Sequence, residues 1–284
     1  MTTAAAAGSF TSGGDLEVNR LAFGAMRITG EGIWGPPADM DEARRVLRRA
    51  VELGVNLIDT ADSYGPHVSE DLIAETLAPY PPGLVIATKG GLERTGPGAW
   101  PRNGRPEHLR RACEGSLRRL RLERIPLYQM HRHDPEVPYE ESIGALKELQ
   151  DEGKIEHIGV SNVTLQQLDV ARGIVDVVSV QNRFGLTDRR SDDVLAVCER
   201  DGIGFLPWAP LDAGTPASDA VVGEIADRHG TTPFGVAIAW LLRRSPVMLP
   251  IPGTSSVAHL EENVAAASIE LDDDAVARLD ALGA

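Results

Sequence analysis

Short apolar runs alternate with amphipathic segments along almost the whole chain. Apolar runs of this length, with little polar alternation inside them, are typical of strands that are buried on both faces of a parallel sheet. They predict eight strands, at residues 21–24, 55–58, 84–89, 125–130, 154–160, 175–181, 204–208 and 247–251.

Between these runs, apolar residues recur at helical spacing and carry start and stop signals. Gly54 closes the first such segment, Pro106 and Pro233 stand at first helical positions, and Thr164 with Gln167 forms a capping box. Helices are therefore expected at 41–53, from Ser69 as N-cap, from 106, at 138–152, from 164, and at 191–201, 218–230, 232–244 and 256–267.

Strict alternation of strand and helix means parallel strands joined by crossover helices. Eight such units in about 260 residues predict an α/β fold of the closed (β/α)8 TIM-barrel type rather than an open sheet. No composition shift or linker divides the chain. We therefore expect a flexible N-terminal segment over residues 1–14 and a single barrel domain over 15–284.

Composition and charge narrow the range of partners. The chain of 284 residues is 42% hydrophobic and carries a net charge of −14, which argues against nucleic acid and anionic membranes as partners. No apolar run reaches the length of about 18 residues that a membrane span needs. Its two cysteines, Cys113 and Cys198, both fall in predicted helices and are expected to be reduced core residues. With no leader-like N-terminus, these features predict a soluble cytoplasmic protein that binds a small molecule, while the oligomeric state stays open.

Polar side chains follow the apolar runs at one end. In a barrel of this type the active site is built from the C-terminal ends of the strands and the loops after them. A set of titratable and amide groups converging on one rim indicates a functional site. The predicted strand ends are Asp59, Lys89, His131, Asn162, Gln181, Trp208 and Gly253.

Four residues at this rim make chemical sense together. A tyrosine such as Tyr64 has a pKa near 10 and needs help to act as an acid or base. An ammonium at Lys89 stabilises the phenolate, and a carboxylate at Asp59 keeps that ammonium charged. A neutral His131 can orient a carbonyl oxygen. The group predicts protonation of a carbonyl oxygen while a hydride reaches its carbon.

Other interpretations of the same residues remain open. A Schiff-base aldolase would use Lys89 as nucleophile. A metal hydrolase would use His131 and His133, but the neighbouring strand ends offer amides rather than further ligands, so no metal is expected. A non-enzymatic cofactor-sensing subunit would keep the same groups without turnover. The pattern Gly30-x-Gly32-x-x-Gly35 is interpreted as a chance match, because two prolines separate it from the next helix.

Several segments, in order and at family spacing, resemble the aldo-keto reductase superfamily over residues 21–283. They are Gly54-Val-Asn-Leu-Ile-Asp-Thr-Ala-Asp-Ser-Tyr-Gly65, Ile86-Ala-Thr-Lys89, Tyr128-Gln-Met-His131, Gly153-Lys-Ile-Glu-His-Ile-Gly-Val-Ser-Asn162 and Ile251-Pro-Gly-Thr-Ser-Ser256. The resemblance implies a barrel enzyme that reduces an aldehyde or ketone with NADPH. Its catalytic tetrad would be Asp59, Tyr64, Lys89 and His131, with Tyr64 as proton donor.

The resemblance also implies where the cofactor binds. Ser161, Asn162 and Gln181 would hold the nicotinamide carboxamide, Phe184 would lie against the ring, and Pro210 and Leu211 would line the pyrophosphate. Many relatives carry a lysine and an arginine for the 2′-phosphate where this chain has Gly253 and His259, so NADH stays an alternative. The other implied cofactor residues are Gly24, Met26, Asp59, Trp208, Ala209, Ile251, Thr254, Ser255, Glu262 and Asn263.

The substrate would meet the variable loops. Candidate contacts are Trp34, Trp100 and Arg132, together with Tyr64 and His131. Gly35-Pro-Pro37, Tyr64-Gly-Pro-His-Val68 and Ile251–Leu260 resemble the pyridoxal-reductase-like branch of the family. These segments do not identify the physiological carbonyl or the preferred reaction direction.

Overall fold

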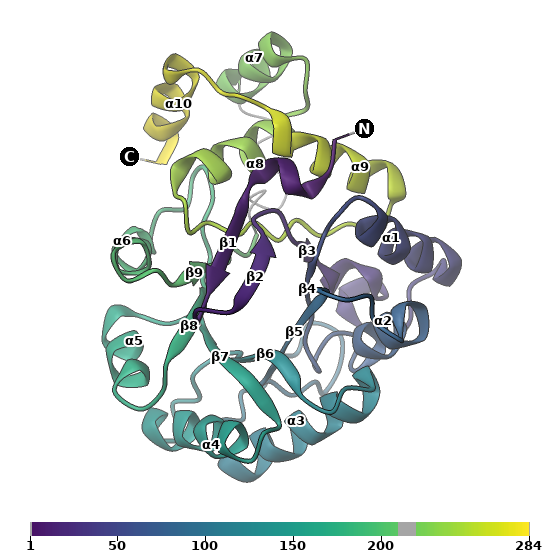
Figure 1. Cartoon of the computed structure of the whole chain (residues 1–284), viewed down its shortest axis with the longest axis vertical. Helices are drawn as coiled ribbons and strands as arrows, with labels where there is room; N and C mark the ends of the chain where they lie inside the picture. The colour runs from purple at the N-terminus through teal and green to yellow at the C-terminus, as the bar shows by residue number, and fades with distance from the viewer. Residues whose placement is uncertain (1, 210–219, 284) are drawn as a thin grey trace.

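The computed structural model describes residues 2–209 and 220–283. Seven parallel strands curl into a barrel in the sequential order β3-β4-β5-β6-β7-β8-β9, with helices outside (Figure 1). The strands are β3 (Phe23–Gly24), β4 (Leu57–Asp59), β5 (Val85–Gly90), β6 (Ile125–Met130), β7 (Ile155–Ser161), β8 (Val177–Gln181) and β9 (Gly204–Phe205).

The barrel closes through the segment predicted as the eighth strand. Within it, Met248 forms a single parallel bridge with Phe205 of β9. On its other side, Ala22 N–H donates to the Pro250 carbonyl at 2.9 Å and Gly24 N–H to the Pro252 carbonyl at 3.2 Å. Pro250 and Pro252 have no N–H to return. The segment therefore completes a (β/α)8 barrel without forming a regular ladder.

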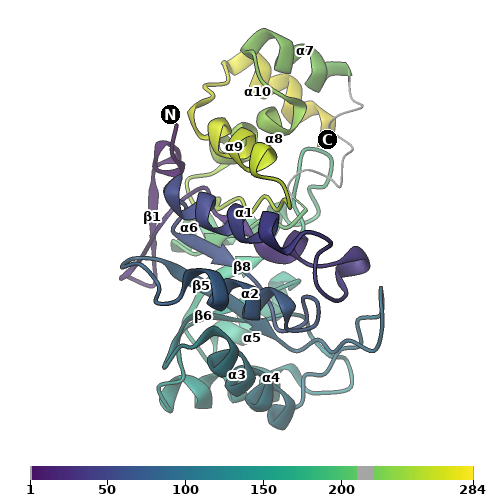
Figure 2. The same ribbon diagram turned by 90° about the vertical axis from the view of Figure 1, so that its right-hand side faces the viewer.

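Helices surround the barrel in the predicted order. They are α1 (Met40–Glu52), α2 (Val68–Leu77), α3 (Pro106–Leu120), α4 (Tyr139–Asp151), α5 (Leu165–Arg172), α6 (Asp192–Asp201), α7 (Ala220–His229), α8 (Pro233–Arg244), α9 (Val257–Ala265) and α10 (Asp273–Asp280). Helices α7 and α10 lie together at one end of the molecule, outside α8 (Figure 2). Cys113 in α3 and Cys198 in α6 are buried free thiols, as predicted.

The N-terminal segment differs from the expectation of a flexible tail. Strand β1 (Ser9–Ser12) pairs antiparallel with β2 (Leu16–Asn19), and this hairpin crosses the end of the barrel that faces the viewer in Figure 1. Val18 is buried in a cluster with Leu57 and Leu127 from the barrel interior, and Ser12 Oγ donates to the Val178 carbonyl. Apolar side chains in the hairpin thus seal the N-terminal end of the barrel, and residues 9–19 belong to the fold.

One local prediction is corrected. Helix α2 starts at Val68 with His67 as N-cap in the left-handed conformation (φ +70°), so Ser69 is not the cap. Ser69 Oγ instead lies 2.8 Å from Thr60 Oγ1 and donates to the Ala25 carbonyl at 3.0 Å. The glycine pattern at residues 30–35 precedes α1 by several residues, as its interpretation as a chance match requires.

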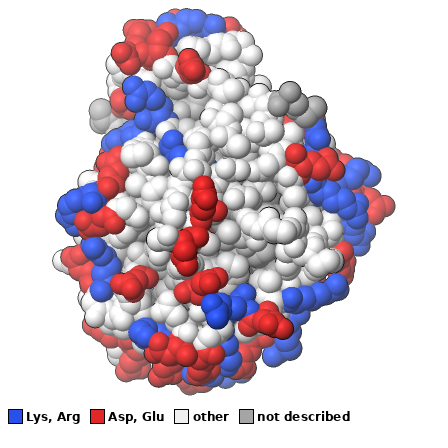
Figure 3. Space-filling view, in the orientation of Figure 1, with Lys and Arg blue, Asp and Glu red and all other residues white. Residues whose placement is uncertain are grey.

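The described surface is mixed in charge. On the face in Figure 3, basic side chains alternate with acidic ones around the edge, and several acidic side chains lie near the centre. Within residues 2–209 and 220–283, every helix is too short or too polar to cross a membrane. In the same ranges, His, Cys, Asp and Glu side chains form no cluster of three that could hold a metal ion.

Candidate active site

Strand register brings the predicted tetrad together at the C-terminal rim. Gly24 aligns with Asp59 between β3 and β4, and Lys89 aligns with Gln129 between β5 and β6. His131 directly follows β6, and its N–H donates to the Gly90 carbonyl at 2.9 Å. Adjacent parallel strands therefore place the carboxylate, the ammonium and the imidazole side by side.

A buried ion pair lies at the centre of the site. Lys89 Nζ is 2.6 Å from Asp59 Oδ2 and 2.7 Å from the Thr60 carbonyl. The other carboxylate oxygen, Oδ1, accepts from Gln129 Nε2 at 3.0 Å and Gln181 Nε2 at 2.9 Å. Lys89 is 0% exposed and Asp59 2%. A charge buried this deeply is tolerated only with such partners, and here three donors surround the carboxylate.

Lys89 also faces the predicted proton donor, with its Nζ 5.2 Å from the centre of the Tyr64 ring. Burial alone would lower the pKa of Lys89, but the charges of Asp59 and Tyr64 and the hydrogen bond to Asp59 outweigh it, so the pKa lies above its usual value. Burial raises the pKa of Tyr64, while the Lys89 ammonium opposes that rise. At neutral pH Lys89 is therefore charged and Tyr64 carries its proton.

His131 completes the group as a neutral imidazole. Its ring lies edge-on to Tyr64, with ring centres 6.0 Å apart, and Nδ1 is 3.5 Å from Ser63 Oγ. Burial, followed by the nearby charges of Lys89 and Arg132, holds the pKa of His131 well below its usual range. A neutral imidazole can donate a hydrogen bond to a carbonyl oxygen without adding a positive charge.

The candidate carboxamide site lies on the neighbouring strand ends. Ser161 aligns with Gln181 between β7 and β8. Asn162 has φ +58°, and its Oδ1 accepts from Arg132 Nη2 at 3.1 Å and from Trp208 Nε1 at 3.0 Å. Its amide nitrogen donates to Ser161 Oγ at 2.9 Å. Three amide and hydroxyl groups thus lie beside the tetrad, with the polar atoms of the Asn162 side chain already hydrogen-bonded within the protein.

The segment before α9 is the candidate phosphate site. Thr254 is buried, and its Oγ1 accepts from Ser256 N–H at 3.1 Å; Ser255 is exposed. The first N–H of α9, on Val257, already donates to Glu42 Oε1 at 2.9 Å. Glu42 is paired with Arg45 at 2.7 Å. Hydroxyls and a helix N-terminus suit a phosphate, but a carboxylate already occupies part of this helix end.

The remaining predicted cofactor residues fall into distinct positions. A Cβ on Gly24 would come within 2.6 Å of the Ile251 carbonyl oxygen, and a Cβ on Gly253 within 2.6 Å of the Gly24 carbonyl oxygen. Ile251 and Asn263 are buried, Met26, Trp208 and Ala209 are partly buried, and His259 and Glu262 are exposed. Pro210 and Leu211 lie outside the described residues.

The position of Phe184 contradicts its predicted role. Its side chain is 0% exposed and stacks on Trp240 of α8 at 6.0 Å between ring centres, with Phe205 edge-on at 5.7 Å. A ring enclosed between β9 and α8 has no open face for a nicotinamide. Phe184 is therefore a core residue that packs between helix α8 and the barrel.

Two predicted substrate residues are joined by one that the sequence analysis missed. The guanidinium of Arg94 lies 3.6 Å from the ring centre of Trp100 and 5.4 Å from that of Trp34. Trp34 forms an isolated bridge with Gly65, the residue after Tyr64. A single arginine in a glycine-rich loop gives no sequence signal that would have singled it out.

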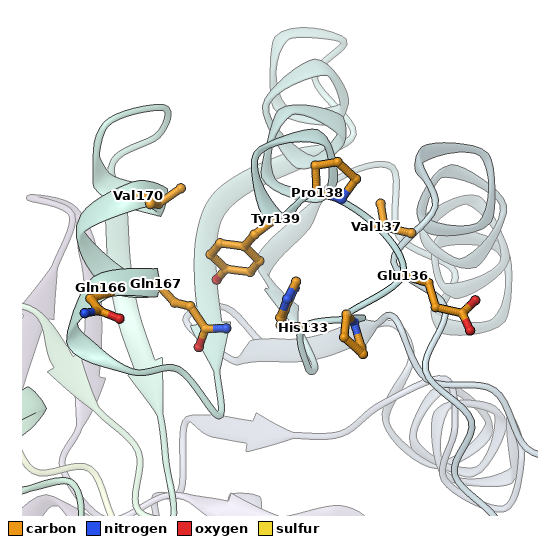
Figure 4. A pocket seen from close by; sticks show the side chains of 9 residues that line it. His133, Glu136, Val137, Pro138, Tyr139, Gln166, Gln167 and Val170 are labelled. Carbon is orange, nitrogen blue, oxygen red and sulfur yellow. The ribbon is translucent and has the colours of Figure 1, made fainter.

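A pocket of about 440 Å³ lies outside the tetrad, between the loop after β6 and helix α5 (Figure 4). The rings of His133 and Tyr139 meet edge-on in its wall at 5.2 Å. Prolines and valines complete much of the lining. Since the tetrad side chains are not among the described residues that line it, this pocket is distinct from the candidate reaction site.

A model of the aldo/keto reductase family matches residues 20–284. The chain belongs to this family. It is 48% identical over 271 residues to an uncharacterized oxidoreductase of Schizosaccharomyces pombe, covering 95% of this chain and 88% of the relative. It is 42% identical over 275 residues to pyridoxine 4-dehydrogenase of Escherichia coli, covering 95% and 96%. The protein is therefore an NAD(P)H-dependent oxidoreductase.

Solved structures agree with this membership. A glycerol dehydrogenase from Gluconobacter oxydans matches with a TM-score of 0.86 at 27% identity, covering 97% of this chain and 95% of its own. A thermostable aldo-keto reductase in complex with the inhibitor epalrestat matches with a TM-score of 0.85 at 31% identity, covering 97% and 99%. Both likenesses span the whole barrel.

Proposed function

We propose that this aldo-keto reductase reduces an aldehyde or ketone to the alcohol with NADPH, and that Tyr64 donates the proton. The observation that carries the proposal is the buried contact of Lys89 with both Asp59 and Tyr64. A phenol beside a fixed ammonium is an acid whose conjugate base is stabilised as it forms. Family membership supplies the reaction class.

Each residue then has a definite task. The hydride that reaches the carbonyl carbon comes from bound NADPH. His131, kept neutral by burial and by the charges of Lys89 and Arg132, orients the carbonyl oxygen. Tyr64 transfers its proton to that oxygen, and Lys89 stabilises the resulting phenolate. Asp59 holds Lys89 in place, and Gln129 holds Asp59.

The Schiff-base alternative is disfavoured by the state of Lys89. A nucleophilic lysine must be neutral, whereas the pKa of Lys89 is raised and its Nζ donates to Asp59 and to the Thr60 carbonyl. A cofactor-sensing role without turnover leaves the protonated Tyr64 without a function. Reduction uses all four buried groups.

NADPH is favoured over NADH by the hydroxyls and the helix N-terminus at residues 254–257. An aldo-keto reductase from Klebsiella pneumoniae, 24% identical and with a TM-score of 0.82, was solved in complex with NADPH. That likeness speaks for a common fold, and the cofactor preference rests on this chain's own residues. The carboxylate of Glu42, which already accepts from the first N–H of α9, disfavours a phosphate at this helix end.

Pyridoxal is the first carbonyl compound to test. The relative from Escherichia coli that shares 42% identity is a pyridoxine 4-dehydrogenase, and it covers almost the whole chain. Dehydrogenation of pyridoxine and reduction of pyridoxal are the two directions of one reaction. We therefore propose pyridoxal as substrate within the broader class of aldehydes and ketones.

The decisive experiment replaces Tyr64 by Phe, which removes only the phenolic oxygen. We expect the rate of pyridoxal reduction to fall by at least about 10²-fold, the lower end for loss of a general acid. The Kd for NADPH, measured by fluorescence titration, should change by less than about twofold because the ring is kept. Wild-type turnover in this variant would show that another group donates the proton.

A further inference from the structure

Arg94 joins three loops at the rim of the barrel. It lies in the loop between β5 and α3, and a guanidinium has five N–H donors. All five are used, by the carbonyl oxygens of Ala99 (3.1 Å), Ile33 (2.7 Å), Ser63 (3.0 Å), Gly32 (3.1 Å) and Gly96 (3.5 Å). These acceptors belong to the loop after β3, the loop after β4 and the loop of Arg94 itself. Arg94 has no donor left for an anionic substrate.

The same guanidinium holds two indole rings. It lies 3.6 Å from the centre of Trp100 and 5.4 Å from that of Trp34, within the range of cation–π attraction. Both tryptophans are partly exposed. Trp34 is also fixed to the loop that carries the proton donor, since it bridges to Gly65, and Gly35 N–H donates to the Gly65 carbonyl. Trp34 and Trp100, called the aromatic wall below, thus share one guanidinium, and the backbone of Trp34 pairs with the residue after Tyr64.

Arg94 binds the carbonyl of Ser63, just before Tyr64, but the Tyr64 backbone has further anchors of its own. Its N–H donates to the Ala61 carbonyl at 3.2 Å, and its carbonyl accepts from Ser69 N–H at 3.2 Å. Its loop is further tied to helix α2 through Thr60 and Ser69. Losing Arg94 should therefore loosen the aromatic wall more than the proton donor.

We infer that Arg94 is a specificity-determining residue that holds Trp34 and Trp100 as a wall for planar aromatic carbonyl compounds. Indole faces stack on planar rings and gain little from a short aliphatic chain. The inference rests on the proposed reductase function and names its substrate class. The proposed substrate class includes both pyridoxal and simple benzaldehydes.

The test compares benzaldehyde with propanal in Arg94→Ala and Arg94→Lys. Lysine keeps the charge but has three donors in place of the planar fork. We expect the ratio of kcat/KM for benzaldehyde over propanal to fall by about tenfold in Arg94→Ala, the loss of roughly one stacking contact. For Arg94→Lys we expect a ratio between those of the wild type and Arg94→Ala. In both variants, most of the change should appear in KM for benzaldehyde.

Arg105→Lys is the matched control, because Arg105 lies in the same loop and forms one exposed ion pair with Glu136 at 3.3 Å. It should keep the wild-type ratio. An equal loss for both aldehydes in the Arg94 variants, or an unchanged ratio, would overturn the inference. A purely structural role would lower the melting temperature and both activities together without moving the ratio.

Failure of the proposed function looks different, because the wild-type protein would then reduce neither aldehyde. The wall can still be tested in that case by tryptophan fluorescence, since two of the four tryptophans form it. Benzaldehyde should quench the wild-type emission in a saturable way and the Arg94→Ala emission far less. Equal quenching of both proteins would reject the wall.

Discussion

At the scale of single residues, predictions from strand ends and predictions from family resemblance had different outcomes. Asp59, Lys89 and His131 were assigned from strand ends alone, and parallel strand register places them side by side. Phe184 was assigned only by resemblance, and its ring points into the core against Trp240. Strand ends fix where the backbone goes, whereas the direction of a side chain in the following loop depends on packing with distant helices.

Glu42 provides a residue-scale test of cofactor choice. Its carboxylate accepts from the first N–H of α9, close to where a 2′-phosphate would bind. In Glu42→Gln, we expect the Kd for NADPH to fall by about threefold, the order of a single charge at a helix end, and the Kd for NADH to stay constant. Glu52→Gln, which removes another exposed partner of an arginine in α1, should leave both unchanged. Equal effects on the two cofactors would place the phosphate elsewhere.

Asp62 provides a test of pH dependence. It is 5% exposed, its Oδ1 has no hydrogen-bond partner among the described residues, and burial, followed by the charge of Glu70, raises its pKa well above the usual value. The folded state thus holds this proton to higher pH than the unfolded state. Its contribution to stability is present below about pH 4, the unfolded pKa, and is lost as pH rises through the folded pKa.

Asp62→Asn removes this titration. The free energy of unfolding of the variant, relative to wild type, should therefore increase between pH 4 and pH 8 in urea denaturation. Asp71→Asn, an exposed acid in the first turn of α2, is the control, and its difference from wild type should stay constant from pH 6 to pH 8. A flat difference for Asp62→Asn as well would mean that Asp62 titrates alike in both states.

At the scale of elements, helix starts and strand cores were predictable, and loops were not. The capping box at Thr164 and the proline at the start of α3 are local signals, and both appear as expected. The start of α2 was placed wrongly because His67 adopts a left-handed conformation that residues other than glycine take in only a few per cent of cases. The role of Arg94 could not be predicted from the sequence because its partners are backbone carbonyls of three separate loops.

Asn182, after β8, supports the element that carries the candidate carboxamide site. Its side chain accepts from Val163 N–H at 2.9 Å and donates to the Val163 carbonyl at 2.8 Å, directly after Asn162. In Asn182→Ala, we expect the Kd for NADPH to rise by about tenfold, in line with the loss of two buried hydrogen bonds. Fluorescence titration measures the change.

Thr164→Ala is the matched control for this element. It removes the cap of α5, one residue further along, and should cost about 1 kcal/mol of stability while NADPH affinity stays within about twofold of wild type. A similar loss of affinity in both variants would mean that general loosening of the loop, rather than the fixing of Asn162, weakens binding.

At the scale of the whole molecule, the alternation of apolar and amphipathic segments was enough to predict the closed barrel. It did not predict which element closes the N-terminal end of the barrel. The hairpin β1–β2 seals the N-terminal end because Val18 and its neighbours pack on the inward-facing side chains of the strands. Its short strands, joined through Gly13 and Gly14, lacked the long periodic signal from which the other elements were predicted.

The incomplete eighth strand has a consequence for hydrogen exchange. The amides of Ala22 and Gly24 donate to the carbonyls of two prolines, in a segment that makes only a single bridge to β9 among the described residues. Local opening there breaks few bonds, so these amides should exchange with deuterium sooner than that of Tyr128 in β6, which lies between two full ladders. Because the same segment leads into Thr254 and Ser255, added NADPH should slow exchange at Ala22 and Gly24 first.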